Sequence, residues 1–303
     1  MASMKMSTAG ALLLLLASCQ TLPKGAACWA LDGRALFPPA LEGADRDRRE
    51  AELATAQAAL AKAPHDRDAA VWVARRLGYL GRYREAIDVL TEALVDHPGD
   101  AFLLRHRGHR WITLREFGKA AADLERAAVA CRLVPDEIEP DGRPSDRPPH
   151  SSLHYNVHYH LGLALFLCGD FALAERAWLD CLAVVWNDES RVAVTHWLWC
   201  VRSRLGDKAG AAAVVAPIRP DMDVVDNKGY HQLCLFYAGK LRREDIVAPK
   251  GSAGAVLAFG LAHQALVLGA REQARREFEM LAKSDGWTAF GVIAAEADLA
   301  RLR

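Results

Sequence analysis

The sequence predicts an all-α protein, an α-solenoid of antiparallel helix pairs, and two observations support this fold class. About half of the 303 residues are hydrophobic, and Leu, Ala, Arg and Glu dominate over β-branched residues, which favours helices over strands. Aromatic, alanine and leucine positions also recur about 34 residues apart, a period typical of helical repeats. The recurring pairs are Tyr83 and Phe117, Ala86 and Ala120, Leu90 and Leu124, and Ala93 and Ala127.

The recurring positions resemble those of the tetratricopeptide repeat (TPR) family. Small alanines let two helices approach closely, and the preceding aromatic residue fills the space beside them. The resemblance implies a right-handed superhelix whose concave groove is lined by the first helix of each repeat. The matching residues are Gly81, Tyr83, Ala86, Leu90, Ala93 and Pro98, then Gly108, Trp111, Phe117, Ala120, Leu124 and Ala127. The chain is also similar to bacterial TPR proteins with a comparable RHRGHR helix and EPDG loop, which implies no activity.

Residues 1–18 are predicted to form a signal peptide. A run of about nine apolar residues follows Lys5, far fewer than the roughly 20 that span a bilayer. The run ends in Leu-Ala-Ser-Cys at 16–19, which resembles the lipobox of bacterial lipoproteins and implies acylation of Cys19. Gln20 is not the Asp that typically retains such proteins in the inner membrane, so the resemblance implies the periplasmic face of the outer membrane. An ordinary secretory signal that is cleaved nearby is the alternative.

The solenoid is predicted to occupy residues 48–303. Residues 19–47 carry prolines and glycines without periodicity, so we expect a lipidated N-terminus and a flexible tether there. A single helix at 48–63 should precede the repeats. The first two repeats are predicted at 67–97 and 100–130, and the third includes Gly169, Phe171, Ala174 and Trp178. The fourth includes Trp197, Gly206 and Ala211, the short fifth turns at Gly239, and the sixth includes Gly269, Ala274 and Phe278.

An insertion at 132–152 interrupts the repeats, because Phe117 and Phe171 lie about one period plus 20 residues apart. It is acidic and rich in proline, which excludes a helix. We expect it to fold back over the groove beside Arg105, Arg107 and His109 and to supply carboxylates. Alternatively, the arginines pair with carboxylates of their own repeat, Glu116, Asp123 or Glu125.

The C-terminal helix is predicted at 287–302. A solenoid needs a terminal cap with a polar outer face, and Glu296, Asp298 and Arg301 suit that role. Six cysteines follow the lipobox, and their spacing matches no metal motif. Since a chain of this size needs no disulfide, we expect most of them to be small core residues.

A basic groove is the candidate binding site. In the TPR family the concave lining would include Arg75, Arg105, His109, Tyr159 and His196. Guanidinium groups bind carboxylates and phosphates through paired hydrogen bonds, so such a groove suits an acidic ligand. The tryptophans at 178, 186, 197 and 199 are expected in the core, although one exposed tryptophan could anchor a partner.

His154 and His158 are weak candidates for a metal site. They are four residues apart and share a helix face, and a loop carboxylate could complete the set. The spacing fixes no third ligand, and histidines near repeat junctions more often make hydrogen bonds between helices. We therefore assign neither a metal nor any other cofactor from the sequence.

The expected function is a membrane-anchored TPR scaffold that binds a protein or peptide partner in its concave groove, with an acidic segment as the candidate ligand. Lys and Arg balance Asp and Glu at 38 each, which argues against nucleic acid as the partner. Standard catalytic motifs are absent, so we expect no enzyme. Two alternatives remain: an enzyme or metal-dependent receptor that uses the Arg/His cluster and the acidic loop, and a structural subunit of an envelope assembly.

Overall fold

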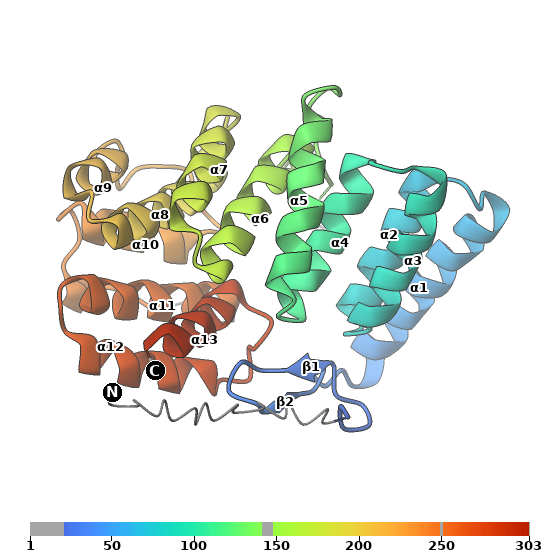
Figure 1. The fold of residues 1–303 in the computed structure, drawn as a ribbon, viewed down its shortest axis with the longest axis horizontal. Helices are drawn as coiled ribbons and strands as arrows, with labels where there is room; N and C mark the ends of the chain where they lie inside the picture. The colour runs from blue at the N-terminus through green and yellow to red at the C-terminus, as the bar shows by residue number, and fades with distance from the viewer. Residues whose placement is uncertain (1–20, 141–147, 249–250, 303) are drawn as a thin grey trace, which may run out of the picture.

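The protein is an all-α solenoid of antiparallel helix pairs, as the sequence predicts. The computed structural model describes residues 21–140, 148–248 and 251–302, which contain 13 α-helices, a 3-10 turn and a small β-hairpin. Figure 1 shows successive helix pairs stacked side by side along a curved path. The predicted signal peptide and Cys19 lie outside the described residues. No helix within the described ranges is long and apolar enough to cross a membrane.

The helix pairs follow the predicted repeats. Helix α1 (Gly43–Lys62) precedes them, and α13 (Phe290–Leu302) ends the chain. The fifth repeat is incomplete, since α10 (Lys228–Tyr237) is followed only by the 3-10 turn (Arg243–Asp245). The pairs are α2 (Arg67–Tyr79) with α3 (Tyr83–Asp96), α4 (Ala101–Thr113) with α5 (Phe117–Cys131), α6 (Leu153–Cys168) with α7 (Phe171–Ala183), α8 (Asp188–Leu205) with α9 (Lys208–Val215), and α11 (Ser252–Val267) with α12 (Arg271–Ala282).

The turn inside each helix pair needs a residue with positive φ. Glycine adopts this left-handed conformation without steric penalty and commonly ends helices. Five repeats have glycine there: Gly81, Gly169, Gly206, Gly239 and Gly269. The second repeat instead has Arg115, with φ of 65°.

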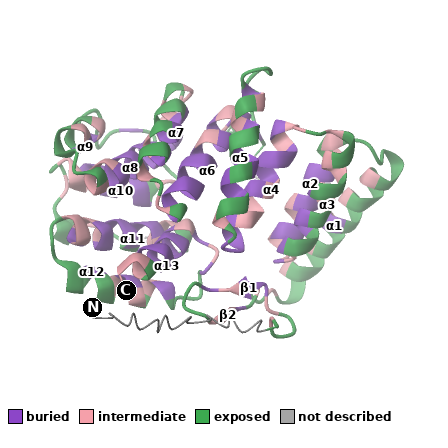
Figure 2. Ribbon diagram, in the orientation of Figure 1, coloured by how far each residue is buried: buried purple, intermediate pink, exposed green. Residues whose placement is uncertain are grey.

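The core is largely aromatic where the middle repeats meet. Trp178 of α7 and Trp197 of α8 are fully buried and stack with ring centroids 5.5 Å apart. Figure 2 shows that buried residues dominate α6, α8 and α13. Trp199 is also buried, whereas Trp186 is 48% exposed. Cys28, Cys131, Cys181, Cys200 and Cys234 are buried free thiols, and Cys168 is an exposed one.

Residues 21–42 differ from the predicted flexible tether. They contain a hairpin of β1 (Cys28–Trp29) and β2 (Ala35–Leu36), and Cys28 and Leu36 are buried against Tyr83, Leu114 and Trp287. The backbone carbonyl of Phe37 accepts a hydrogen bond of 2.7 Å from Trp287 Nε1. The prolines and glycines therefore shape a packed hairpin rather than a free linker.

The hairpin lies between the two ends of the solenoid, beside α1 and α13 (Figure 1). Arg34 donates a hydrogen bond of 2.8 Å to the carbonyl of Ala282 at the end of α12. The backbone N–H of Leu31 donates to Glu296 of α13, at 3.3 Å. Segments far apart in sequence are thereby joined, and the curved solenoid closes on itself.

The prediction of a polar outer face on α13 is wrong for Glu296 and Asp298. Glu296 is 3% exposed and Asp298 is fully buried. Asp298 pairs with Arg301 at 2.8 Å, with Arg204 at 3.2 Å and with His263 at 3.4 Å. Charged side chains are found inside proteins when they are paired, and here the partners come from three helices.

Candidate binding site on the concave face

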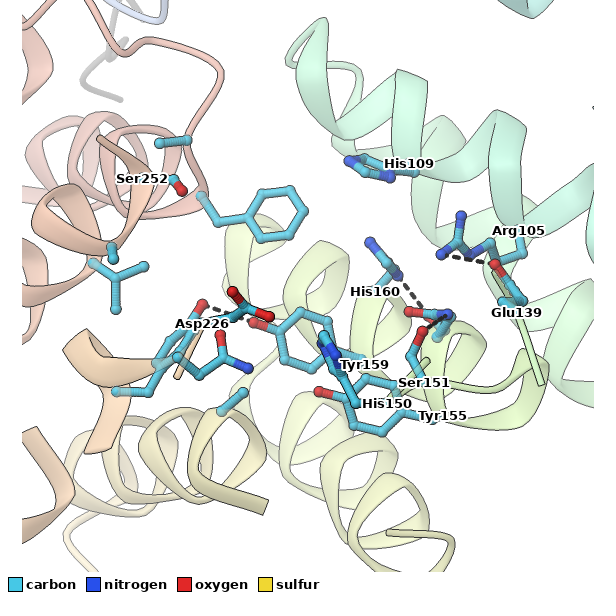
Figure 3. Close-up of a pocket in the computed structure, with 18 of the residues that line it drawn as sticks. Arg105, His109, Glu139, His150, Ser151, Tyr155, Tyr159, His160, Asp226 and Ser252 are labelled. Atoms are coloured by element: carbon cyan, nitrogen blue, oxygen red, sulfur yellow. Dashed lines mark hydrogen bonds and ion pairs between the residues drawn. The ribbon is translucent and has the colours of Figure 1, made fainter. Parts of the chain in front are cut away.

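A cavity of about 500 Å³ occupies the concave face of the solenoid. Side chains from α2, α4, α6, α8, α10 and α11 line it, together with the segment that leads into α13. The first helix of each pair thus contributes to one shared space, because the second helices pack on the outside. Figure 3 shows Arg105 and His109 on one side of this space and Asp226 and Ser252 across from them.

Four of the five predicted groove residues line this cavity: Arg75, Arg105, His109 and Tyr159. His196 does not line it. Its ring is fully buried and packs against Trp197, Tyr230 and Phe259. On α8 the cavity-facing residue is Ala193, so His196 lies on the face of α8 that packs in the core.

The basic end of the cavity holds a buried ion pair. Arg105 Nη2 lies 3.1 Å from Glu139 Oε2, and the two residues are 8% and 4% exposed. Arg75 donates a hydrogen bond of 2.7 Å to the carbonyl of Pro140. Burial raises the pKa of Glu139 and lowers the pKa of Arg105, because a low-dielectric site disfavours both charged forms.

The described part of the acidic insertion folds back against this end of the cavity. Ile138 and Ser152 form an antiparallel bridge, and the backbone N–H of Glu139 donates to the carbonyl of Ser151 at 3.0 Å. Asp136 accepts hydrogen bonds from Ser152 Oγ at 2.7 Å and from the N–H of His154 at 2.9 Å. These bonds hold Glu139 beside Arg105. Two further acidic residues of the insertion, Asp141 and Asp146, lie outside the described residues.

Arg107 takes its partner from its own repeat, not from the insertion. Its guanidinium donates two hydrogen bonds of 2.7 Å to Asp123 of α5 and one of 3.0 Å to Thr91 of α3. The expectation that the insertion covers Arg107 is therefore wrong, and the alternative pairing within the repeat is correct. The insertion contacts Arg105 and Arg75 instead.

Two neutral histidines lie together in the middle of the cavity wall. The rings of His109 and His160 have centroids 4.6 Å apart, and His160 Nδ1 donates a hydrogen bond of 2.6 Å to the carbonyl of Asn156. His160 Nε2 is then the unprotonated nitrogen. Burial lowers the pKa of His160 to about 3 and lowers that of His109 well below its usual value. Both rings are therefore uncharged at neutral pH.

Tyrosines line the cavity next to these histidines. The hydroxyl oxygens of Tyr159 and Tyr230 are 2.8 Å apart, and Trp197 Nε1 donates to Tyr159 at 2.9 Å. Burial raises the pKa of Tyr230 to about 12, so the phenol remains protonated. Asp226 supplies an exposed carboxylate on the same wall. The sequence did not reveal Tyr230 and Asp226 as site residues. Both belong to the short fifth repeat, where Tyr230 lies on α10 and Asp226 lies just before this helix.

His154 and His158 do not face this cavity. They line a separate outer groove of about 590 Å³ between α5, α6 and α7. No group of three His, Cys, Asp or Glu side chains that could hold a metal ion occurs in the part of the chain that the structure describes. These two histidines therefore cannot join Arg105 and His109 in one site.

The fold and the site define a closed α-solenoid with a polar cavity on its concave face. Scans against models of protein families and against curated proteins found no match.

Three solved structures are similar in fold. The TPR protein YrrB, described as having an unusual peptide-binding site, shares 12% identity over 75% of this chain and 90% of its own, with a TM-score of 0.44. A tetratricopeptide repeat protein from Parabacteroides merdae ATCC 43184 shares 16% identity over 82% and 93% of the two chains, with a TM-score of 0.49. A structure of Naa15/Naa10 bound to HypK-THB shares 15% identity over 82% and 36%, with a TM-score of 0.39.

Proposed function

We propose that the protein is a non-catalytic scaffold that holds a segment of a protein or peptide partner in its concave cavity. The observation that supports this most directly is that the first helices of successive repeats converge on one space of about 500 Å³. Binding cavities for organic ligands commonly measure about 300–1,000 Å³. The space is large enough for a few side chains of a partner and too small for a folded domain.

The segment that we propose is acidic. Arg75 and Arg105 both line the cavity, and the insertion already places a carboxylate, Glu139, 3.1 Å from Arg105. Charge-assisted hydrogen bonds between guanidinium and carboxylate are about twice as strong as neutral ones. A partner with an acidic side chain could therefore use the same guanidinium groups, in competition with Glu139.

The ionisable groups of the cavity support binding rather than catalysis. A general base works best when its pKa lies near the operating pH, whereas burial lowers the pKa of His160 to about 3. Tyr230 has its pKa raised to about 12 and stays a phenol. His160 and Tyr230 thus act as fixed hydrogen-bonding groups that move few protons at neutral pH.

Site-specific photo-crosslinking tests the proposed function. A photoreactive amino acid replaces Ser252, which lines the cavity and is exposed within it, in the natural host. A control places the same group at Val95, which is 78% exposed on α3. We expect a discrete adduct with a partner at position 252 only, identified by mass spectrometry. Equal labelling at both positions, or no adduct at 252, would contradict the proposal.

We further propose that the protein is a lipoprotein of the bacterial envelope, anchored through Cys19 at the periplasmic face of the outer membrane. The lipobox-like Leu-Ala-Ser-Cys supports this, and two or more acyl chains suffice for stable anchoring. Cys19→Ala should abolish acylation and release the protein or leave its precursor unprocessed. Unchanged membrane fractionation of this variant, together with a wild-type protein that carries no acyl chain, would refute the anchor.

A further inference from the structure

A second, smaller cavity of about 140 Å³ adjoins the main one between α2 and α4. Arg75, Arg105 and His109 line both spaces. The remaining polar lining consists of Tyr79, His106 and Arg110. We call this space the arginine recess. The guanidinium groups of Arg75, Arg105 and Arg110 therefore line a space whose volume equals that of a few water molecules, at about 30 Å³ for each.

The positive charge of the recess is not balanced by the described residues. Glu139 is the carboxylate that pairs with Arg105, and Arg75 bonds to a neutral carbonyl and a phenol. The side chain of Arg110 makes no hydrogen bond or ion pair within the described ranges. Three arginines and one glutamate give a net charge of +2.

The Arg110 guanidinium is held in place by the shape of α2. A Cβ atom on Gly78 would lie 2.6 Å from Arg110 Nη1, so glycine leaves the room that the guanidinium occupies. The guanidinium carbon also lies 5.8 Å from the centre of the Tyr83 ring. Arg110 is thus packed between two helices without a counter-ion, and burial lowers its pKa to about 10.

One donor of Arg105 also lacks a partner. Arg105 Nε is buried and makes no hydrogen bond within the described residues, although Arg105 as a whole is 8% exposed. An unsatisfied buried donor costs about 1–3 kcal/mol.

We propose that the arginine recess binds a phosphate group, either as inorganic phosphate or on a phosphorylated segment of a partner. A phosphate monoester carries a charge of about −1.5 to −2 at neutral pH, which matches the surplus of +2, whereas a carboxylate would neutralise only half of it. Its oxygens can accept from several guanidinium groups at once. Binding of a phosphorylated partner rests on the proposed function, since the partner would reach the recess through the main cavity. Binding of inorganic phosphate does not depend on the proposed function.

Isothermal titration calorimetry of the purified full-length protein tests this proposal. The probes are inorganic phosphate and a phosphoserine peptide, with the unphosphorylated peptide and chloride at equal ionic strength as comparators. We expect phosphate or the phosphoserine peptide to bind measurably and the comparators not to bind. Tighter binding of the phosphopeptide would indicate a partner-borne group, and tighter binding of inorganic phosphate would indicate the free ion. Failure of both probes would overturn the proposal.

Variants assign the binding to the recess. Arg110→Gln removes the unpaired charge and should weaken binding by at least about tenfold. Gly78→Ala keeps the charge but displaces the guanidinium, and it should weaken binding too. Arg84→Gln, on the exposed surface of α3, should bind like wild type, and circular dichroism checks that each variant is folded. Unchanged affinity in both folded recess variants would refute the site, while a crosslinked partner at position 252 would leave the proposed function intact.

Discussion

Arg115 and Glu296 lie 181 residues apart in sequence and form a buried ion pair. Arg115 Nη2 donates to Glu296 Oε1 at 2.5 Å and Nε donates to Oε2 at 3.2 Å. The same guanidinium donates to the carbonyls of Thr113 and Trp287, at 2.7 and 2.8 Å. Because Glu296 also accepts from Leu31, this cluster joins the end of α4, the β-hairpin and α13, and so closes the solenoid around its cavity.

The Arg115 pair predicts a specific order of stabilities. Arg115→Ala leaves Glu296 buried without its partner, which typically costs about 3–5 kcal/mol. Arg115→Gly loses the same pair but relieves the positive φ of 65°, a conformation that costs a non-glycine residue roughly 1–2 kcal/mol. We therefore expect the free energy of unfolding in urea to rank wild type above the glycine variant and the glycine variant above the alanine variant.

A surface arginine provides the control for this series. Arg48 pairs with Asp45 and Glu52 at an exposed position of α1, and exposed pairs contribute little to stability. Arg48→Ala should therefore lower the free energy of unfolding far less than Arg115→Ala does. If Arg115→Ala were equally mild, the ion pair would not be what holds the turn after α4 to α13.

The local signals in the sequence predicted the helix pairs, because those signals act within one repeat. Alanine and leucine at a 34-residue period decide where two helices meet, and Ala120 is fully buried as its position implies. Glycines at the turns also match their left-handed conformations. Each of these features depends on neighbours within a few dozen residues.

Closure of the solenoid could not be predicted in the same way. Glu296 has the spacing of an exposed residue on a terminal helix, and its burial depends on Arg115, in the second repeat, and on the backbone N–H of Leu31. His196 likewise occupies a first helix, yet the aromatic rings of neighbouring repeats enclose it. Both outcomes depend on contacts between segments that no local pattern relates.

Two helix glycines predict opposite effects of the same substitution. A Cβ on Gly162 of α6 would lie 2.5 Å from the indole of Trp178, which is stacked on Trp197 and cannot easily move. Gly162→Ala should lower stability by about 1–3 kcal/mol through overpacking. At Gly118 of α5 nothing lies within 4 Å, so Gly118→Ala should be neutral or stabilise by up to about 1 kcal/mol. Equal melting temperatures would contradict the packing of α6 on α7.

Glu139 is predicted to compete with acidic ligands for Arg105. Glu139→Gln removes the charge at 3.1 Å from the guanidinium and should tighten binding of an acidic peptide, in a manner that weakens with salt. This single change is preferable to deleting 136–147, because Asp136 holds Ser152 and the start of α6. Glu137→Gln, at an exposed position, is the matched control. Equal peptide affinity in both variants, measured by fluorescence anisotropy, would exclude competition.

Buried neutral histidines predict that acid destabilises the protein. Burial lowers the pKa of His160 and of His196 to about 3 each, whereas an unfolded histidine titrates near 6.5. Between these values the unfolded chain binds more protons than the folded one, so stability falls as the pH falls. Each residue should remove about 2 kcal/mol of stability on going from pH 7 to pH 5. Glu139 has the opposite effect: because burial raises its pKa, its contribution to stability increases as the pH falls. The lowered pKa values of several histidines outweigh this single group.

Urea unfolding at pH 7 and pH 5 isolates the contribution of one ring. His196→Gln should be less stable than wild type at pH 7, because His196 is fully buried in an aromatic environment. Between pH 7 and pH 5, however, the free energy of unfolding of this variant should fall by about 2 kcal/mol less than that of wild type. The reason is that the unfolded variant has one proton-binding site fewer. Val95→Ala, at an exposed position of α3 without a titratable side chain, should keep the full wild-type loss. A wild-type stability that is the same at both pH values would show that these rings take up protons without unfolding.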